Sequence, residues 1–309
     1  MMDHNGPFIH VIGVDVGGTK IAGGIVSLPA GEILYRLEQP TLASRGGSAV
    51  LDEARALVGR LASEGISRGV KVSAIGLGVP ELVGLDGRVT SAHNFDWRDI
   101  ELAHAFGGLP ATVDADVRAA ALAEATHGAG RARHSFLYVT IGTGISCCLV
   151  LGGNPLAGAR GNALAFASGA MRRTCGQCGA EETRVLEEYA SGPALAARYN
   201  AAGGAAATRA EDVLTAACSG DDLASDVVVS GAVELGGQVG LLVNALDPEA
   251  VVVGGGLGSA DGVYWDHFVE STRRQIWSCE SARLPIEHAG LGPAAGIVGA
   301  ALRAGECLR

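Results

Sequence analysis

The sequence predicts an α/β protein built from two related lobes, and three observations support this prediction. A strand, a glycine turn and a second strand span residues 10–26, and the same arrangement recurs over residues 136–151. Apolar residues at helical spacing alternate with β-branched runs through the rest of the chain. Glycine makes up 47 of the 309 residues, roughly twice the usual share, so it must serve turns, tight packing and loops that approach a ligand.

The predicted elements change type repeatedly along the chain. In order they are strand 10–16, strand 21–26, helix 48–62, strand 72–79, helix 114–125, strand 136–141, strand 145–151, helix 184–199, helix 231–246, strand 250–253 and helix 294–304. The repeated strand–turn–strand unit predicts two lobes. We place them at residues 1–110 and 111–294, with the last helix, within residues 295–309, completing the first lobe.

The charge balance excludes some classes of partner. The formal net charge is −10 and the sequence pI is about 5.3, which argues against a nucleic-acid or anionic-membrane surface. A phosphorylated ligand remains compatible, because backbone N–H groups bind phosphate without cations. No uncharged apolar run reaches membrane-spanning length, and the first seven residues lack the apolar stretch of a secretory signal. With seven cysteines in no disulfide pattern, we expect a cytoplasmic protein.

The first motif with a chemical signature ends the first strand. It contains Asp15, Gly17, Gly18, Thr19 and Lys20. Glycines let main-chain N–H groups approach a phosphate closely, and the threonine hydroxyl adds a donor. A carboxylate at this point can hold a hydrated Mg²⁺ beside the phosphates. The alternative is a plain hairpin turn.

Two further glycine motifs also follow strands. They comprise Gly142, Thr143 and Gly144, and then Gly254, Gly255 and Gly256. The motif at residues 142–144 is suited to bind a polyphosphate together with the first motif. The motif at residues 254–256 is suited to a nucleoside that lies against the backbone. For the latter, a tight connection between a strand and a helix is the alternative.

The three motifs have the order and spacing of the ROK family, which the chain resembles over nearly its whole length. The resemblance includes residues 76–80, Asn94 with Trp97, Leu186-Glu187 and residues 292–301. It implies two ribonuclease H-like lobes of the actin-like ATPase type with a cleft between them. It also implies ATP-dependent phosphorylation of a hexose, usually at its primary hydroxyl. The family's repressors carry an additional helix-turn-helix, for which about nine residues before the first strand leave no room.

The resemblance also identifies a catalytic aspartate. The family places it where a strand meets an alanine-rich helix, and residues 114–121 read DADVRAAA here, so the match is Asp116. This carboxylate would orient the acceptor hydroxyl and accept its proton. The alternative is a helix N-cap. Two residues later, Arg118 replaces a family asparagine and would meet either a phosphate or a nearby carboxylate.

Several of the residues that bind the sugar acceptor in the family are replaced in this chain. The family's sugar-binding Asn, Glu and His fall on Ala115, Ala165 and Ser168, and the last two lie in a segment, residues 161–168, that reads GNALAFAS where the family has GNAGEIGH. A family glycine is replaced by Glu81. The substrate contacts that we expect come from Glu81, Asn94, Asp116 and Glu187. A pocket that has lost polar partners should bind glucose poorly.

The relocated carboxylate suits an amine-bearing or otherwise altered acceptor. We therefore predict a modified hexose, either an aminosugar such as kanosamine or a C7-cyclitol, with ATP and Mg²⁺ as cofactors. The alternative for Glu81 is that it points to solvent. The alternatives for the protein are a glucokinase-type hexose kinase and a non-catalytic, sugar-responsive binding protein. Family resemblance also implies a homodimer.

A structural zinc ion is not expected. The family's zinc site uses one histidine and three cysteines, and this chain offers Cys175 and Cys178 at the usual spacing. Ser168, Ala180 and Val185 fall near the other ligand positions. Two thiolates without two further nitrogen or sulfur ligands make a poor zinc site. The cysteine pair is therefore interpreted as a remnant.

Overall fold

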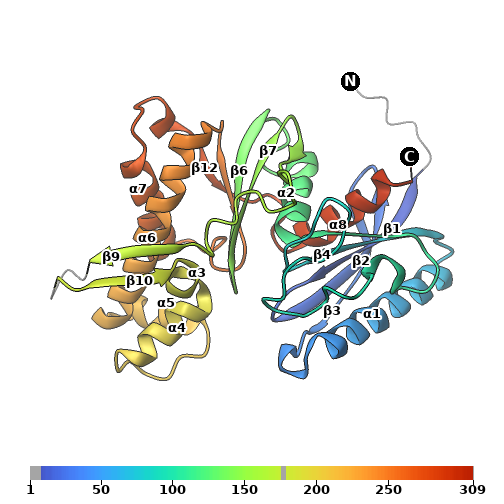
Figure 1. Ribbon diagram of the computed structural model, residues 1–309, viewed down its shortest axis with the longest axis horizontal. Helices are drawn as coiled ribbons and strands as arrows, with labels where there is room; N and C mark the ends of the chain where they lie inside the picture. Colours follow the sequence, from blue (N-terminus) through green and yellow to red (C-terminus); the bar gives the residue numbers. More distant parts are fainter. Residues whose placement is uncertain (1–7, 175–178, 309) are drawn as a thin grey trace. The chain divides into compact units, whose positions relative to one another are not determined.

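The computed structural model describes residues 8–174 and 179–308, which form two compact α/β units (Figure 1). Unit 1 comprises residues 1–132, 150–163 and 290–309, and unit 2 comprises residues 133–149 and 164–289. The predicted boundary at residue 110 therefore lies inside unit 1. The chain leaves unit 1 twice and returns to it at residue 150 and again at residue 290.

Unit 1 is built on a five-stranded sheet with the order β3-β2-β1-β4-β5. Its strands are β1 (Ile9–Val16), β2 (Lys20–Leu28), β3 (Glu32–Pro40), β4 (Val72–Val79) and β5 (Ala111–Ala115). The first three are antiparallel neighbours, whereas β4 is parallel to both β1 and β5. The pairing of β5 with β4, from Ala111 beside Ile75 to Ala115 beside Val79, is the reason that the first unit extends past residue 110.

Three helices belong to this unit, namely α1 (Gly47–Ser67), α2 (Asp116–His127) and α8 (Ala295–Glu306), with short 3₁₀ turns η1 (Ala43–Arg45), η2 (Leu102–His104) and η4 (Gly292–Ala294). The apolar stripe predicted for α1 is buried, including Leu57 and Leu61. Helix α8, red in Figure 1, packs on β1 and β4. A Cβ at Gly13 or Gly76 would collide with the α8 backbone, so glycine permits this close packing.

The second five-stranded sheet, most of which lies in unit 2, repeats the strand order of the first. The sheet is ordered β12-β11-β6-β7-β8, with β6 (Ser135–Ile141), β7 (Ile145–Leu151), β8 (Asn154–Pro155), β11 (Val251–Gly254) and β12 (Ile286–His288). Strands β7 and β8 are antiparallel, and β11 is parallel to both β6 and β12. In both sheets, three strands consecutive in sequence are followed by two parallel strands from later in the chain. The predicted duplication is therefore present at the level of topology.

The remaining elements of unit 2 are the hairpin of β9 (Ala170–Thr174) and β10 (Glu181–Val185), the helices α3 (Glu187–Ala190), α4 (Gly192–Ala201), α5 (Ala210–Cys218), α6 (Asp222–Leu246) and α7 (Val263–Gln275), and the turn η3 (Ser281–Arg283). The single helix predicted over residues 184–199 is wrong. Its first residues belong to β10, and Ser191 starts a new helix by accepting the N–H of Ala194.

Helix α6 is long and apolar enough to cross a membrane by length and composition alone. One such helix is weak evidence, because the core helix of a soluble protein meets the same criterion. Here Gly236 and Gly240 pack against α7, and a Cβ at either position would lie 2.5 Å from a backbone oxygen of that helix. The expectation that no uncharged run reaches this length holds only because Glu234 interrupts it.

Candidate functional site

The first glycine motif forms the tight turn between β1 and β2. The N–H of Gly17 donates to the carbonyl oxygen of Lys20 at 2.9 Å. From the end of β3, buried Thr41 supports the turn, because its hydroxyl donates to the Gly17 carbonyl at 2.6 Å and its N–H donates to that of Thr19 at 3.0 Å. Sequence reasoning missed Thr41, whose contact with Gly17 spans 24 positions.

Asp15 lies just before this turn in the middle of the sheet. Its backbone neighbours are Ala22 on β2 and Gly78 on β4. Burial raises the pKa of its carboxyl from 3.8 to about 6, while the Lys20 ammonium and the Arg36 guanidinium act in the opposite direction. A carboxylate that has lost hydration gains from a divalent cation, so the donor chemistry at Asp15 fits Mg²⁺.

The predicted cofactor residue Lys20 forms an ion pair across the sheet. Its ammonium lies 3.7 Å from the carboxylate of Glu38 on β3, and both side chains are about half exposed. Such a pair contributes little to stability. Lys20 therefore remains accessible to an anionic ligand.

Asp116 is the first residue of α2. The helix N-cap is Ala115, so Asp116 does not fill the N-cap position considered in the sequence. Its Oδ1 accepts the N–H of Val117 at 2.6 Å, which places the carboxylate at the positive end of the helix. A Cβ at Gly78 would lie 3.4 Å from the Cα of Asp116. Gly78 thus adjoins both Asp15, its partner in the sheet, and Asp116.

Residues 80–95, which we call the acceptor loop, follow β4 directly and include Asn94. Glu81 is buried in this loop, with 5 % of its surface exposed. Its Oε1 accepts the N–H groups of Asn94 at 2.5 Å and Phe95 at 2.8 Å, and its Oε2 accepts the N–H of His93 at 2.9 Å and the hydroxyl of Ser91. A carboxylate has about four acceptor positions, and four donors from the protein fill them.

The role of Glu81 as a direct substrate ligand stays a prediction. In the structure its carboxylate does not point to solvent, because three backbone N–H groups and the Ser91 hydroxyl already bind it. Asn94, by contrast, is exposed, and its Nδ2 donates to the carbonyl oxygen of Pro80 at 2.7 Å. In the acceptor loop, the side chain of Asn94 is therefore exposed and that of Glu81 is buried.

Arg118 is the second buried charge beside this loop. Its guanidinium binds the carboxylate of Asp114, with Nε 2.6 Å from Oδ1, and also donates to the carbonyl oxygens of Val83 and Gly161. Of the two partners considered from the sequence, the structure selects the carboxylate. Asp114 also accepts a bond from Arg303 of α8 at 2.8 Å.

The segment with the altered family pattern, residues 161–168, contains two residues with positive φ. Gly161 has a φ of +81°, and a Cβ there would collide with the carbonyl group of Val83. Leu164 stands where the family has glycine and retains a φ of +61°, which is rare for a leucine. Ala165 and Ser168 are exposed. Ala165 and Ser168 thus stand in place of the family's glutamate and histidine at exposed positions.

In unit 2, the second glycine motif closes a turn between β6 and β7. The N–H of Gly142 donates to the carbonyl oxygen of Gly144, and the N–H of Gly192 donates to that of Gly142, both at 2.9 Å. Glu187 lies against the same turn, since its Oε2 accepts the N–H of Ile145 at 2.7 Å. A Cβ at Gly144 would lie 2.7 Å from that oxygen. The predicted substrate residue Glu187 therefore supports the turn.

The third glycine motif follows β11 and folds back onto the end of β6. The carbonyl oxygen of Ile141 accepts the N–H groups of Leu257 at 3.0 Å and Gly258 at 2.9 Å. Gly255 has a φ of +83°, and a Cβ there would collide with Ile141. A Cβ at Gly142 would lie 3.6 Å from the nitrogen of Gly256. Unit 2 thus brings its two glycine motifs side by side.

Cys175 and Cys178 lie outside the described residues. Among the residues that the structure does describe, no group of three His, Cys, Asp or Glu side chains could hold a metal ion. Cys147 and Cys148 on β7 are buried, and burial raises the pKa of the Cys147 thiol. Both are therefore core residues.

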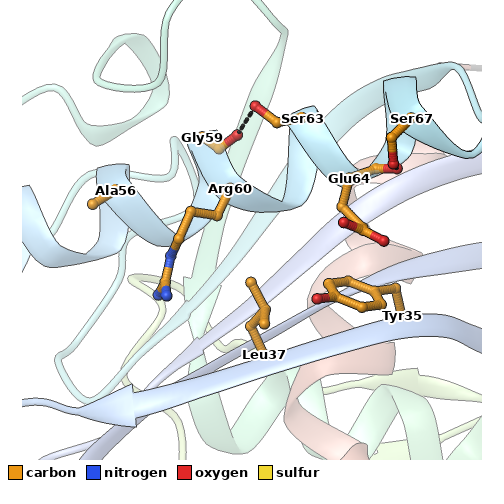
Figure 2. A pocket seen from close by; sticks show the side chains of 8 residues that line it. All are labelled: Tyr35, Leu37, Ala56, Gly59, Arg60, Ser63, Glu64 and Ser67. Atoms are coloured by element: carbon orange, nitrogen blue, oxygen red, sulfur yellow. Dashed lines mark hydrogen bonds between the residues drawn. The ribbon is translucent and has the colours of Figure 1, made fainter.

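A pocket lies between α1 and β3 of unit 1 (Figure 2). Figure 2 shows Arg60 and Glu64 extending from the helix toward Leu37 and Tyr35 of the strand. Its lining consists of Tyr35, Leu37, Ala56, Gly59, Arg60, Ser63, Glu64 and Ser67. None of the predicted site residues is among them.

Two five-stranded sheets with one strand order, each with a glycine turn after its first strand in sequence, define the actin-like ATPase class of folds. The chain belongs to the ROK family, whose family model matches residues 11–306.

Among its relatives, the glucokinase of Halalkalibacterium halodurans is 35 % identical over 81 % of either chain, and the kanosamine kinase of Amycolatopsis mediterranei is 30 % identical over 95 % of either chain. A ROK family glucokinase from Streptomyces griseus, solved with glucose and AMPPNP, superimposes with a TM-score of 0.82 at 30 % identity, covering 96 % of this chain and 99 % of its own.

Proposed function

We propose that this protein, a ROK-family sugar kinase, transfers the γ-phosphoryl group of ATP to the primary hydroxyl of a modified hexose. An aminosugar such as kanosamine and a C7-cyclitol are the candidate acceptors. The observation that carries this proposal is the loss of the family's Asn, Glu and His, which fall on Ala115, Ala165 and Ser168. A site built to bind a hydroxyl rejects analogues without it, and a site without those groups loses its preference for glucose. A relative is named kanosamine kinase.

In the proposed reaction, backbone N–H groups of the glycine turns bind the phosphates of ATP. The carboxylate of Asp116 accepts the proton of the acceptor hydroxyl as its oxygen bonds to the γ-phosphorus. The bond from that phosphorus to the β–γ bridging oxygen breaks, and ADP leaves. Asp15 would hold Mg²⁺, which when bound neutralises charge on the phosphates.

Glucose is the second candidate acceptor. It is favoured by the 35 % identity to a relative named glucokinase and by the structural match to a glucokinase solved with glucose. Glu81 does not favour an aminosugar over glucose, because its carboxylate is already fully hydrogen-bonded.

A coupled assay of ADP release separates the candidates. The panel is glucose, mannose, N-acetylmannosamine, kanosamine and a valiolone-type cyclitol, compared by kcat/KM. We expect kanosamine or the cyclitol to exceed glucose. Glucose as the clearly best acceptor would reject the modified-hexose proposal. Sugar binding without turnover for every acceptor would instead support a non-catalytic, sugar-responsive protein. Family resemblance also supports a homodimer, which light scattering would detect.

A further inference from the structure

Two charged side chains are buried beside the acceptor loop where the ROK pattern has uncharged residues. Glu81 occupies a family glycine position and Arg118 a family asparagine position, and they are 5 % and 7 % exposed. Burying a charge is costly unless hydrogen bonds and opposite charges compensate. Both residues have that compensation within the protein, and in both cases the partners include the acceptor loop.

Glu81 fixes the returning limb of the loop. Three successive backbone N–H groups, those of His93, Asn94 and Phe95, point at its carboxylate, and the Ser91 hydroxyl completes the set. Hydrogen bonds to an ionised acceptor are roughly twice as strong as neutral ones. The backbone conformation that carries Asn94 is therefore set by Glu81.

Arg118 fixes the outgoing limb. Its guanidinium donates to the carbonyl oxygen of Val83 at 2.9 Å and to that of Gly161 at 2.5 Å, so it binds both segments at once. Arg118 lies two residues after Asp116, in the first turn of α2. The anchor of the loop is therefore the same helical turn that carries Asp116.

Backbone bonds also link the two limbs to each other. The N–H of Thr90 donates to the carbonyl oxygen of Leu82 at 2.8 Å, and the N–H of Gly84 donates to that of Arg88 at 2.9 Å. The acceptor loop is thus a closed hairpin held at both limbs by buried charges.

We propose that Glu81 and Arg118 are positioning residues that hold the acceptor loop, and with it Asn94, in a fixed place relative to Asp116 before the acceptor binds. The idea rests on the proposed function, in that Asn94 and Asp116 serve the acceptor. If the acceptor loop is already ordered, no free energy is lost in ordering it when the acceptor binds. The affinity for the acceptor therefore depends on the bonds that hold the loop in place. The same rigidity restricts acceptors to those that fit one loop shape.

The kinetic test uses Glu81→Gln, which keeps the shape but replaces one acceptor oxygen with an NH₂ group that faces backbone donors. We expect the KM for the acceptor to rise about 10- to 100-fold, with the KM for MgATP within about twofold of the wild type. Arg118→Met should have the same selective effect. Equal rises in both KM values, or no rise in the acceptor KM, would overturn the proposal.

A matched control is Glu101→Gln. Its carboxylate binds Arg88 of the same loop at 2.6 Å, but these side chains are 56 % and 62 % exposed. Exposed pairs contribute little, so the acceptor KM should not change. If Glu81→Gln does not fold, Ser91→Ala removes one of the four donors and should raise only the acceptor KM, by about 3- to 10-fold.

Hydrogen exchange gives a readout that needs no substrate. In Glu81→Gln, the amides of residues 93–95 should exchange about 10- to 100-fold faster than in the wild type and in Glu101→Gln. Unchanged exchange would refute the positioning role even if the protein phosphorylates sugars. Faster exchange confined to these residues would support the role even if no sugar on the panel were phosphorylated, in which case only the proposed function would fail.

Discussion

Gly296 lies directly against the carboxyl group of Asp15, since a Cβ at position 296 would lie 2.5 Å from Cγ of the aspartate. The glycine is the second residue of α8, and the aspartate is the penultimate residue of β1. Space for the carboxylate is therefore created by the last helix of the chain.

Replacing this glycine tests whether that space matters. Gly296→Ala should displace the Asp15 carboxylate and raise the KM for MgATP about tenfold, because small misplacements of catalytic geometry are costly. Gly59→Ala is the control, since nothing lies within 4 Å of a Cβ there and alanine favours the helix. An unchanged KM in Gly296→Ala would mean that nucleotide binding does not depend on the position of this carboxylate.

The raised pKa of Asp15 predicts a pH-dependent stability. The folded state holds the proton up to a pH of about 6 and the unfolded state only to 3.8, so ionisation of Asp15 costs stability as the pH rises through this window. Asp15→Asn should therefore be more stable than the wild type at pH 8, by up to about 3 kcal/mol, and nearly equal to it at pH 4. Thermal unfolding of both proteins at each pH measures this. A difference that grows at low pH would contradict it.

The same carboxyl predicts a pH effect on nucleotide binding. Because the protonated form does not hold a divalent cation well, Mg²⁺-dependent affinity for ATP should fall as the pH drops through about 6. The affinity without Mg²⁺ should change much less. Titration calorimetry at pH 5 and pH 8, with and without Mg²⁺, makes the comparison. Equal Mg²⁺ dependence at both pH values would remove Asp15 from the metal site.

Asp116→Asn tests the proposed proton acceptor. The amide keeps the shape but cannot accept the proton, so kcat should fall about 10²- to 10⁴-fold while nucleotide affinity is retained. Asp52→Asn is a suitable control, because Asp52 is an exposed carboxylate on α1. Turnover by Asp116→Asn at the wild-type rate would exclude the assigned role.

Thr41→Val tests the support of the first glycine turn. Loss of the hydroxyl leaves the Gly17 carbonyl without its 2.6 Å donor, at a cost of about 1 kcal/mol. We expect the KM for ATP to rise about fivefold. Thr215→Val removes a similar hydroxyl bond on an exposed face of α5 and should leave this KM unchanged. If both variants behave alike, Thr41 does not act through the turn.

The duplicated hairpins and the first core helix could be predicted because their signals are local. Gly17 and Gly142 follow β-branched runs directly, and the apolar residues of α1 recur at helical spacing. The predicted boundary at residue 110 falls inside unit 1 because β5 is short and its partner, β4, lies more than 30 residues earlier in the chain. Parallel pairing of this kind leaves no local pattern.

The acceptor side could be predicted only in part. The sequence identified Glu81 and Arg118 as unusual, but their partners are distant along the chain. Ser91 and Phe95 are 10 and 14 positions from Glu81, and Gly161 is 43 positions from Arg118. The sequence does not show whether a charged side chain binds a ligand or the protein's own backbone. Its partners are determined only when the loop has folded.

The discontinuity of unit 1 has a consequence for synthesis. Asp15 is translated before unit 2, whereas Gly296 and the rest of α8 are translated after it. All of unit 2 lies between them, so it can leave the ribosome and fold first, since domains generally fold as units. The strands of unit 1 must wait with one face uncovered until α8 arrives. The space against the Asp15 carboxyl group is therefore completed only after the whole of unit 2 has been made.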